Sequence, residues 1–285
     1  MTRPPALYWR ALSDDTIQCL LCPRRCAIEN GQSGHCGART NFHGRMEIPF
    51  YAMVSSLAVD PIEKKPLARY LPGTYSFSVG FWHCTMDCPF CQNWEIAHPK
   101  PRHVFPRSIE ASELITQALA AGTPSISFTY SEPCLHAEYL LECMSLAKTR
   151  GLKTVLVTNG CIQVPAARDI LALTDAANVD LKSSSAEKYV KVLGGSLETV
   201  INFIQLASSY CHLEVTALAV PGILDSEEDF DLIGRILSII DPSIPLHITS
   251  YHPDYRWNLP ALDASQVRNL ARPAGRWLKN LIIHA

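Results

Sequence analysis

Short, nearly continuous apolar runs recur along the chain from residue 75 onward, and amphipathic segments separate them. The runs are YSFSVGFW (75–82), SISFTY (125–130), TVLVTNG (154–160), AANVDLK (176–182), LEVTALAV (213–220) and PLHITSY (245–251). Apolar residues at helical spacing occur near 110–121, 135–150, 165–172, 196–209 and 226–240, and more weakly near 263–272. Apolar strands that alternate with helices indicate a parallel sheet with right-handed crossovers.

The number of these units narrows the fold class. Six strand–helix units without a dinucleotide-binding glycine fingerprint favour an α/β fold, a partial (β/α)6 TIM-like barrel, over a Rossmann sheet. In such a barrel, function resides in the loops that follow the strands. Those loops include WHCTMDCPFCQNWE, SEPC, TNGC and DLKS, which hold most of the reactive side chains after position 50.

The first 74 residues follow a different pattern. Residues 1–50 are rich in Cys, Gly and Arg and show little apolar periodicity, as in a small unit stabilised by loops or a metal. Residues 51–75 contain DPIEKKPLARYLPG and predict an extended connector in which Lys64 and Lys65 are solvated. We therefore expect a small Cys-rich N-terminal extension with its connector (1–74) and the barrel (75–285).

Composition and charge exclude several classes of protein. The chain has 285 residues, 47% of them hydrophobic. Its net charge is -2, so it lacks the excess of basic residues that nonspecific nucleic-acid binding needs. No apolar stretch approaches the roughly 20 residues of a membrane span, and the first residues lack the apolar core of a signal peptide. We therefore expect a cytoplasmic protein without a membrane or nucleic-acid partner.

The 11 cysteines are the most informative part of the composition. Because their number is odd and the expected compartment is reducing, clustered cysteines point to metal binding or catalysis before disulfides. One set is Cys84, Cys88 and Cys91; the other is Cys19, Cys22, Cys26 and Cys36. The four cysteines outside these sets are expected to be small buried packing residues: Cys134, Cys143, Cys161 and Cys211.

The spacing Cys84-x3-Cys88-x2-Cys91 places three thiolates on one loop directly after the first barrel strand. Three thiolates can hold three corners of a cubane iron–sulfur cluster and leave the fourth iron open to a small molecule. Zinc completed by His83, which would have to fold back, and thiols without metal are the alternatives. We favour the iron–sulfur interpretation.

The N-terminal cysteines have the spacing Cys19-x2-Cys22-x3-Cys26-x9-Cys36. Four thiolates from two short loops match a structural zinc site. A second iron–sulfur cluster, able to relay electrons, and free thiols are the competing interpretations. His35, next to Cys36, is a candidate to replace one cysteine as a ligand.

With Phe90 before its last cysteine, the Cys84 loop resembles that of the radical S-adenosylmethionine (SAM) enzymes. The resemblance implies a [4Fe–4S] cluster whose fourth iron is chelated by the amino and carboxylate groups of SAM. One electron from the cluster would cleave SAM to methionine and a 5′-deoxyadenosyl radical, which abstracts hydrogen from a substrate. An electron donor such as flavodoxin or ferredoxin is implied as well, together with a partial (β/α)6 barrel.

The later strand ends extend this resemblance. SEP (131–133) stands where the family places a stretch that binds the SAM amino group. TNG (158–160) and DLK (180–182) resemble strand ends of pyruvate formate-lyase-activating enzymes that line the cavity for SAM and substrate. The cofactor-binding residues implied by the resemblance are Phe90, Ser131, Glu132, Thr158, Asn159, Asp180, Lys182 and His247.

Several of these residues also have a purely structural interpretation. Glu132 could be an acid that favours a helix N-terminus, and Asn159 with its glycine could form a turn. Asp180 and Lys182 could be a surface ion pair, and His247 a histidine satisfied within the core.

Longer segments resemble one subgroup, the radical SAM component of the AmmeMemoRadiSam system. They are LCPRRCAIENGQSGHCGAR (21–39), SSLAVDPIEKKPL (55–67), CPFCQNWEI (88–96) and HPDY (252–255). The chain departs from this pattern at Ser250, where many relatives have arginine, and at IIHA (282–285), beyond which relatives carry a further Cys-x2-Cys pair. We expect these departures to affect substrate contacts or a lid and to leave the cluster loop intact.

The leading hypothesis is a radical SAM enzyme that acts on an unidentified substrate, either a small molecule or a macromolecule. An activase of a glycyl-radical enzyme, of the pyruvate formate-lyase-activating type, is the alternative within the same chemistry. A non-catalytic iron–sulfur electron-transfer module and a zinc-stabilised interaction protein are the alternatives outside it.

Overall fold

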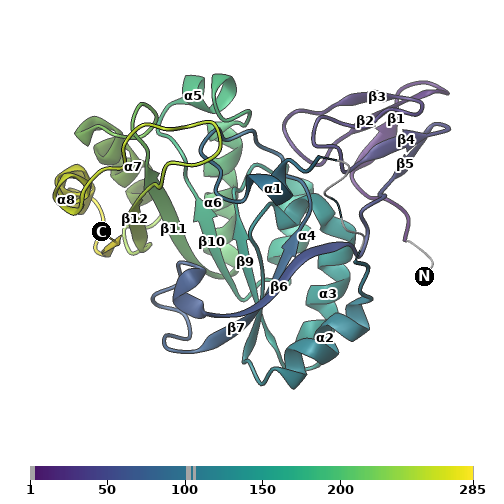
Figure 1. Cartoon of the computed structure of the whole chain (residues 1–285), viewed down its shortest axis with the longest axis horizontal. Coiled ribbons are helices and arrows are strands. Elements are labelled where there is room, and N and C mark those ends of the chain that lie inside the picture. Colours follow the sequence, from purple (N-terminus) through teal and green to yellow (C-terminus); the bar gives the residue numbers. More distant parts are fainter. Residues whose placement is uncertain (1–3, 101–103, 105–106, 285) are drawn as a thin grey trace.

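An eight-stranded sheet forms the centre of the computed structural model, which describes residues 4–100, 104 and 107–284 (Figure 1). The strand order is β13-β12-β11-β10-β9-β8-β7-β6. The strands are β6 (Val54–Pro61), β7 (Tyr75–Phe81), β8 (Ser125–Thr129), β9 (Lys153–Thr158), β10 (Ala176–Asp180), β11 (His212–Ala219), β12 (Leu246–Ser250) and β13 (Leu281–His284). Neighbours from β7 to β13 are parallel, whereas β6 is antiparallel to β7.

Helices connect the parallel strands and line the outer side of the curved sheet (Figure 1). They are α1 (Trp94–Ala97), α2 (Ala111–Ala120), α3 (Ala137–Thr149), α4 (Val164–Leu171), α5 (Ala186–Lys191), α6 (Leu197–Tyr210), α7 (Glu227–Ile240) and α8 (Ala264–Ala271). Short 3-10 turns are η1 (Ile62–Lys64), η3 (Pro133–His136) and η4 (Arg272–Arg276). Successive helices pack side by side, α2 on α3, α3 on α4, α4 on α6 and α6 on α7. This outer layer on a parallel sheet confirms the partial α/β barrel.

Local sequence explains where several of these helices begin. Ser185, Ser196 and Ser226 are the N-caps of α5, α6 and α7, and each side chain accepts a hydrogen bond from a backbone N–H in the first turn. Asp263 and Gln266 form a capping box at the start of α8. The strands between them are buried because helices cover one face and the barrel interior the other; all five residues of β8 are buried.

The N-terminal residues form a small lobe of short strands beside the barrel (Figure 1). These strands are β1 (Trp9–Ala11), β2 (Thr16–Cys19), β3 (Ala27–Glu29), β4 (Thr40–Phe42) and β5 (Arg45–Glu47). A buried ion pair joins the lobe to the barrel, with Arg39 Nη2 and Glu138 Oε1 2.9 Å apart. At the lobe's edge the hydroxyl of Tyr8 donates to Asp169 at 2.7 Å.

The expected connector has a different role from the one predicted. Its residues 54–61 are extended, but they form β6 and pair with β7 along the edge of the main sheet. Lys65 is not solvated as expected: its side chain is 1% exposed, and its Nζ lies 2.7 Å from Asp60. Lys64 is 69% exposed, as expected. Burial of Lys65 follows from the pairing of β6, which brings Asp60 to the sheet.

The predicted strands and helices from residue 75 onward are all present, with small shifts at their ends. β13 and the five short N-terminal strands were not predicted, because runs of three or four residues carry too little periodicity. None of the helices in the described part of the chain has the length and apolar content that crossing a bilayer requires.

Candidate active site

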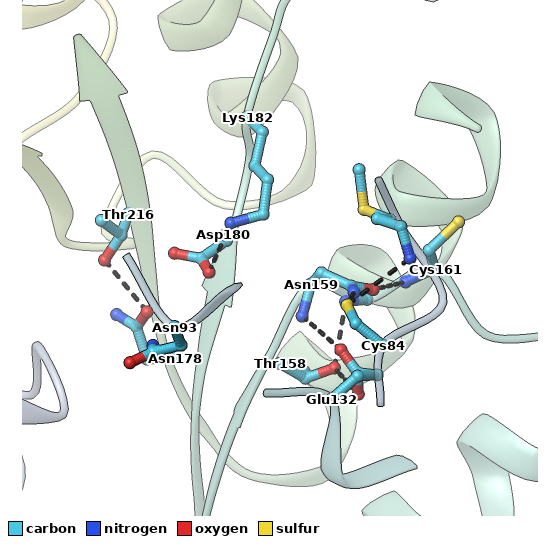
Figure 2. Close-up of polar contacts among 12 residues, drawn as sticks. Cys84, Asn93, Glu132, Thr158, Asn159, Cys161, Asn178, Asp180, Lys182 and Thr216 are labelled. Carbon is cyan, nitrogen blue, oxygen red and sulfur yellow. Dashed lines mark hydrogen bonds and ion pairs between the residues drawn. The ribbon is translucent and has the colours of Figure 1, made fainter. Parts of the chain in front are cut away.

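A cavity of about 320 Å³ opens inside the barrel at the carboxyl ends of the parallel strands. Its wall contains side chains from the loop after β7 and from the ends of β9 and β10. The members that the sequence analysis proposed are Phe90, Ser131, Asn159, Asp180, Lys182 and the three cysteines Cys84, Cys88 and Cys91. Figure 2 shows how several of them converge from different strands. The position agrees with the general rule that barrel enzymes react at this end.

The three cysteines reach this cavity because the chain turns sharply after β7. His83 has φ 72°, in the left-handed region that non-glycine residues rarely adopt. Its backbone N–H donates to the carbonyl of Ile96 at 2.7 Å, which folds the loop back onto α1. As a result Cys84, Cys88 and Cys91 face one common space although they span only eight positions of the sequence.

Burial raises the pKa of all three thiols, that of Cys88 to about 12. Glu132 raises the pKa of Cys84 further, whereas Lys182 opposes the rise at Cys88 and Cys91. These thiols therefore keep their protons at neutral pH until a cation replaces them, which is how metal ligation deprotonates cysteine.

The donors around Cys84 fit an iron–sulfur cluster. The backbone N–H of Met86 and the side-chain Nδ2 of Asn159 each lie 3.5 Å from the Cys84 sulfur. Hydrogen bonds to ligating sulfurs stabilise thiolate charge and tune the reduction potential. Three thiols on one loop with such donors, beside an open cavity, suit a [4Fe–4S] cluster whose fourth iron takes an external ligand.

A charged pair lies at the end of β10. Asp180 and Lys182 both line the cavity, and the Lys182 Nζ is 2.8 Å from the Asp180 carboxylate (Figure 2). Burial alone would lower the pKa of Lys182, but Asp180 and Cys88 raise it above its ordinary value. The cavity therefore presents a permanent cation to a bound anionic group.

Glu132 and Thr158 do not line the cavity. Glu132 is fully buried and accepts hydrogen bonds from the Thr158 hydroxyl at 2.7 Å and the Asn159 N–H at 2.8 Å (Figure 2). It also accepts a hydrogen bond from the Cys134 N–H at 3.1 Å. Burial raises the pKa of Glu132, and these hydrogen bonds oppose the rise. The structure therefore does not place Glu132 as a direct SAM ligand; its oxygens join the ends of β8 and β9.

Asn159, Ser131 and Phe90 all line the cavity. Asn159 lies at the cavity wall, where its Nδ2 also donates to Thr85 at 3.1 Å and its Oδ1 accepts from the Cys161 N–H at 2.8 Å. Ser131 donates to the carbonyl of Phe81 at 2.9 Å, so it ties two strand ends together. Phe90 is buried between the second and third cysteines and contributes an aromatic face to the cavity.

His247 lies away from this mouth, at the amino end of its strand. Its Nε2 is 2.6 Å from Glu214, and its Nδ1 is 2.9 Å from His284. Glu214 also accepts backbone hydrogen bonds from Ala68 and Arg69, which close the opposite end of the barrel. Glu214 and the ring of His284 occupy both ring nitrogens of His247. The structure thus favours a core histidine with its hydrogen bonds made inside the protein, not a SAM contact.

Two other histidines do not sit where a metal ligand would be needed. The His83 ring packs on Phe50 and faces Gly37 of the lobe, so it does not line the cysteine cavity. His35 has its Nε2 2.8 Å from Asp87, a residue of the cluster loop. The four N-terminal cysteines, by contrast, all line one small pocket.

Several polar residues that line the cavity were not predicted from the sequence. Thr216 and Thr249 line the cavity from β11 and β12, and Thr216 donates to Asn178 at 3.0 Å (Figure 2). Asn93, just after the cysteine loop, donates to the carbonyl of Tyr130 at 2.8 Å. The two-residue period of β11 was a usable signal, because Glu214, Thr216 and Leu218 must share one face.

Comparison with known proteins agrees with this geometry. The family model of the radical SAM superfamily matches residues 83–233. Protein MJ0808 of Methanocaldococcus jannaschii is 34% identical over 276 residues, which cover 95% of this chain and 82% of that protein. The pyruvate formate-lyase-activating enzyme of Staphylococcus epidermidis is 24% identical over 185 residues, 59% of this chain and 71% of that enzyme.

A solved structure extends the agreement to the fold. A radical SAM methyltransferase from Sphaerobacter thermophilus superposes with a TM-score of 0.58 at 12% identity, over 99% of this chain and 77% of that one. The family match spans the cysteine loop and the strand ends through residue 233. The chain is therefore an enzyme that uses a [4Fe–4S] cluster and SAM, and it belongs to the radical SAM superfamily.

Proposed function

We propose that Cys84, Cys88 and Cys91 hold the [4Fe–4S] cluster and that SAM binds beside it across the mouth of the barrel. The observation that carries the proposal is that these thiols and the Asp180–Lys182 pair line one cavity. When bound, the cluster supplies the electron that cleaves SAM to methionine and a 5′-deoxyadenosyl radical, which takes hydrogen from the substrate. A low-potential donor such as flavodoxin or ferredoxin would reduce the cluster, in the cytoplasm.

The chain's own residues have distinct roles in this proposal. Lys182 offers its ammonium to the carboxylate of SAM, and Asp180 orients that ammonium through their 2.8 Å contact. Phe90 provides a buried aromatic face for the adenine. Asn159 donates to the Cys84 sulfur, while Glu132 and Thr158 hold the strand ends on which Asn159 is mounted.

The size of the cavity limits the substrate. About 320 Å³ lies at the lower end of the roughly 300–1,000 Å³ that ligand pockets occupy. Because SAM must take part of this space, the substrate presents only a small group to the radical. We propose a small molecule, or a single side chain of a peptide, whose polar groups meet Thr216 and Thr249.

Anaerobic reconstitution with iron and sulfide, followed by dithionite and SAM, tests this function directly. The expected product is 5′-deoxyadenosine, measured by liquid chromatography. Absence of this product while the cluster is present would refute reductive cleavage of SAM. Calorimetry separates the enzyme from an electron-transfer module, because the module has no reason to bind SAM.

Similarity to the Staphylococcus epidermidis activating enzyme keeps glycyl-radical activation as a second candidate. The experiment is to mix reduced, SAM-loaded enzyme with a glycyl-radical enzyme from the same cell. A glycine-centred doublet in the electron paramagnetic resonance (EPR) spectrum would establish activation. 5′-Deoxyadenosine without that doublet, formed when a small-molecule extract is added, would favour the first proposal.

A further inference from the structure

A second, closed pocket lies in the N-terminal lobe, behind the cluster loop. Four thiols line it: Cys19 at the end of β2, Cys22 and Cys26 in the turn to β3, and Cys36 in the following loop. All four are free cysteines. The remaining wall combines the apolar side chains of Leu21, Ile28 and Leu135 with polar residues, among them two arginines. Four thiols from separate positions that face one space form the ligand set of a metal centre with sulfur donors.

Arg39 gives an independent indication of what occupies this pocket. Its side chain is 1% exposed and lines the pocket. Both terminal nitrogens are used, since Nη1 and Nη2 bond to Glu138. The third donor, Nε, has no hydrogen-bond partner among the residues that the structure describes. Buried donors are almost always satisfied, and a centre bound by four thiolates carries the negative charge that Nε–H would meet.

The size of the pocket bears on which centre fits. A water-sized sphere fits inside it, with about 10 Å³ available to the centre of the sphere. Around tetrahedral zinc, four sulfurs lie about 2.3 Å from one point and leave no such space. A cluster of several irons spreads its ligands more widely.

We infer that Cys19, Cys22, Cys26 and Cys36 bind a second iron–sulfur cluster, whose sulfur ligands receive a hydrogen bond from Arg39 Nε. Because four thiolates complete the ligand set of a cubane cluster, this centre has no open iron for SAM. It therefore differs in chemistry from the centre at the barrel mouth.

The second pocket touches the loop that carries the first centre. Thr85 lines the pocket, while its neighbour Cys84 lines the barrel cavity. Arg24, another wall residue, has its Nη2 2.7 Å from Asp87, between the first and second cysteines of the loop. His35 lies 2.8 Å from the same carboxylate. The two cysteine sets thus lie on opposite sides of one short segment, residues 84–88.

The test removes the three cysteines of the first centre and measures how much iron the protein still binds. The triple variant C84A/C88A/C91A is reconstituted anaerobically, and iron, acid-labile sulfide and zinc are measured per chain. We expect about four irons and four sulfides in the variant, against about eight of each in the wild type. A variant that holds no iron, or zinc in place of iron, overturns the inference. The count does not depend on SAM cleavage, so it can fail while the proposed function stands.

Two further variants guard against misfolding. C36A should lose the second set of irons and keep the change that SAM induces in the EPR spectrum of the first centre. C143A, at a buried cysteine outside both sets, is the matched control and should keep all the iron. Unchanged iron in C36A, with circular dichroism like the wild type, would contradict the ligand assignment.

The role of Arg39 is tested by its conservative variant. R39K keeps a positive charge near Glu138 but has no Nε–H. Redox titration followed by EPR should show the potential of the second centre shifted to a more negative value, because a hydrogen bond to its sulfur is lost. An unchanged reduction potential would show that Arg39 Nε does not donate a hydrogen bond to the second centre.

Discussion

The two cysteine regions of this protein differ in number of thiols, in access and in charge. At the barrel mouth three thiols border a cavity of about 320 Å³ whose wall carries Asp180 and Lys182. In the lobe four thiols border a closed pocket of about 10 Å³ whose wall carries two arginines, Arg24 and Arg39, and no carboxylate among the described residues. Two cysteine clusters of one protein can therefore differ in chemistry because different residues and spaces surround them. Three thiols beside an open space leave room for a reactant to bind next to the sulfurs. Four thiols in a closed pocket leave no place for a substrate.

The largest effect should come from removing one thiol at the mouth. Cys88→Ala should lower 5′-deoxyadenosine formation by about a thousandfold or more, a loss of at least about 4 kcal/mol in transition-state stabilisation. Liquid chromatography of reduced reactions measures it. Cys143→Ala is the control and should retain wild-type activity. Activity of Cys88→Ala near the control would break the assignment of the reactive centre to the mouth.

The next effect compares two arginines of the lobe. Arg39→Ala leaves the buried Glu138 without its partner and should lower the free energy of unfolding by about 3–5 kcal/mol. Arg24→Ala breaks a partly exposed pair with Asp87 and should cost about 1 kcal/mol or less. Urea unfolding followed by circular dichroism measures both. Equal losses would show that the lobe does not depend on its buried ion pair.

A smaller effect concerns the charged wall of the mouth. Lys182→Met should raise the dissociation constant of SAM about 10- to 100-fold, because a half-buried cation that meets an anionic group contributes about 1.4–2.8 kcal/mol. Lys191→Met, on the exposed face of α5, is the matched control, since Lys191 is exposed and its ion pair with Glu187 lies in solvent. Isothermal titration calorimetry gives both constants. An unchanged affinity in Lys182→Met would place the SAM carboxylate elsewhere.

The smallest effect concerns the histidine between the two regions. His136 lies 2.7 Å from the carbonyl of Trp82, two residues before the first loop cysteine, and burial lowers its pKa to about 4. The unfolded chain therefore binds a proton below about pH 6.5 that the folded chain does not, so stability falls as the pH drops from about 6.5 toward 4.

Between pH 7.5 and 5.5 this loss should be about 1 kcal/mol in the free energy of unfolding. His136→Gln should lose correspondingly less stability over the same range. His43→Gln, at an exposed position, should behave as the wild type. Urea unfolding at the two pH values measures the difference. Equal pH dependence in His136→Gln and wild type would show that His136 does not carry it.

Much of the fold was predictable because local patterns specify it. The strands from β7 to β12 are apolar runs, and the helices between them begin at residues such as Ser196 and Ser226 that cap them. The prediction failed at β6, since its pairing with β7 is decided by contacts that no local pattern contains. Lys65 was misassigned for the same reason: its partner Asp60 is near in sequence, but its burial depends on the sheet.

The candidate site was predictable to a smaller extent. Residues such as Asp180 and Lys182 reach the cavity because each follows a strand of a parallel sheet. Glu132 also follows a strand, yet it points into the protein and takes three hydrogen bonds there. His247 lies in the right strand but at its amino end. Position along a strand and side-chain direction decide such roles, and neither is visible in a short motif.

By itself the sequence determined the spacing of Cys84, Cys88 and Cys91 and the strand–helix alternation of the barrel, because both are short-range properties of the chain. The tertiary structure alone decided that the lobe's four thiols share one closed pocket with Arg39. It also decided that Arg24 and His35 meet Asp87 on the cluster loop. These contacts join residues more than 50 positions apart, and only packing of the lobe against the barrel brings them together.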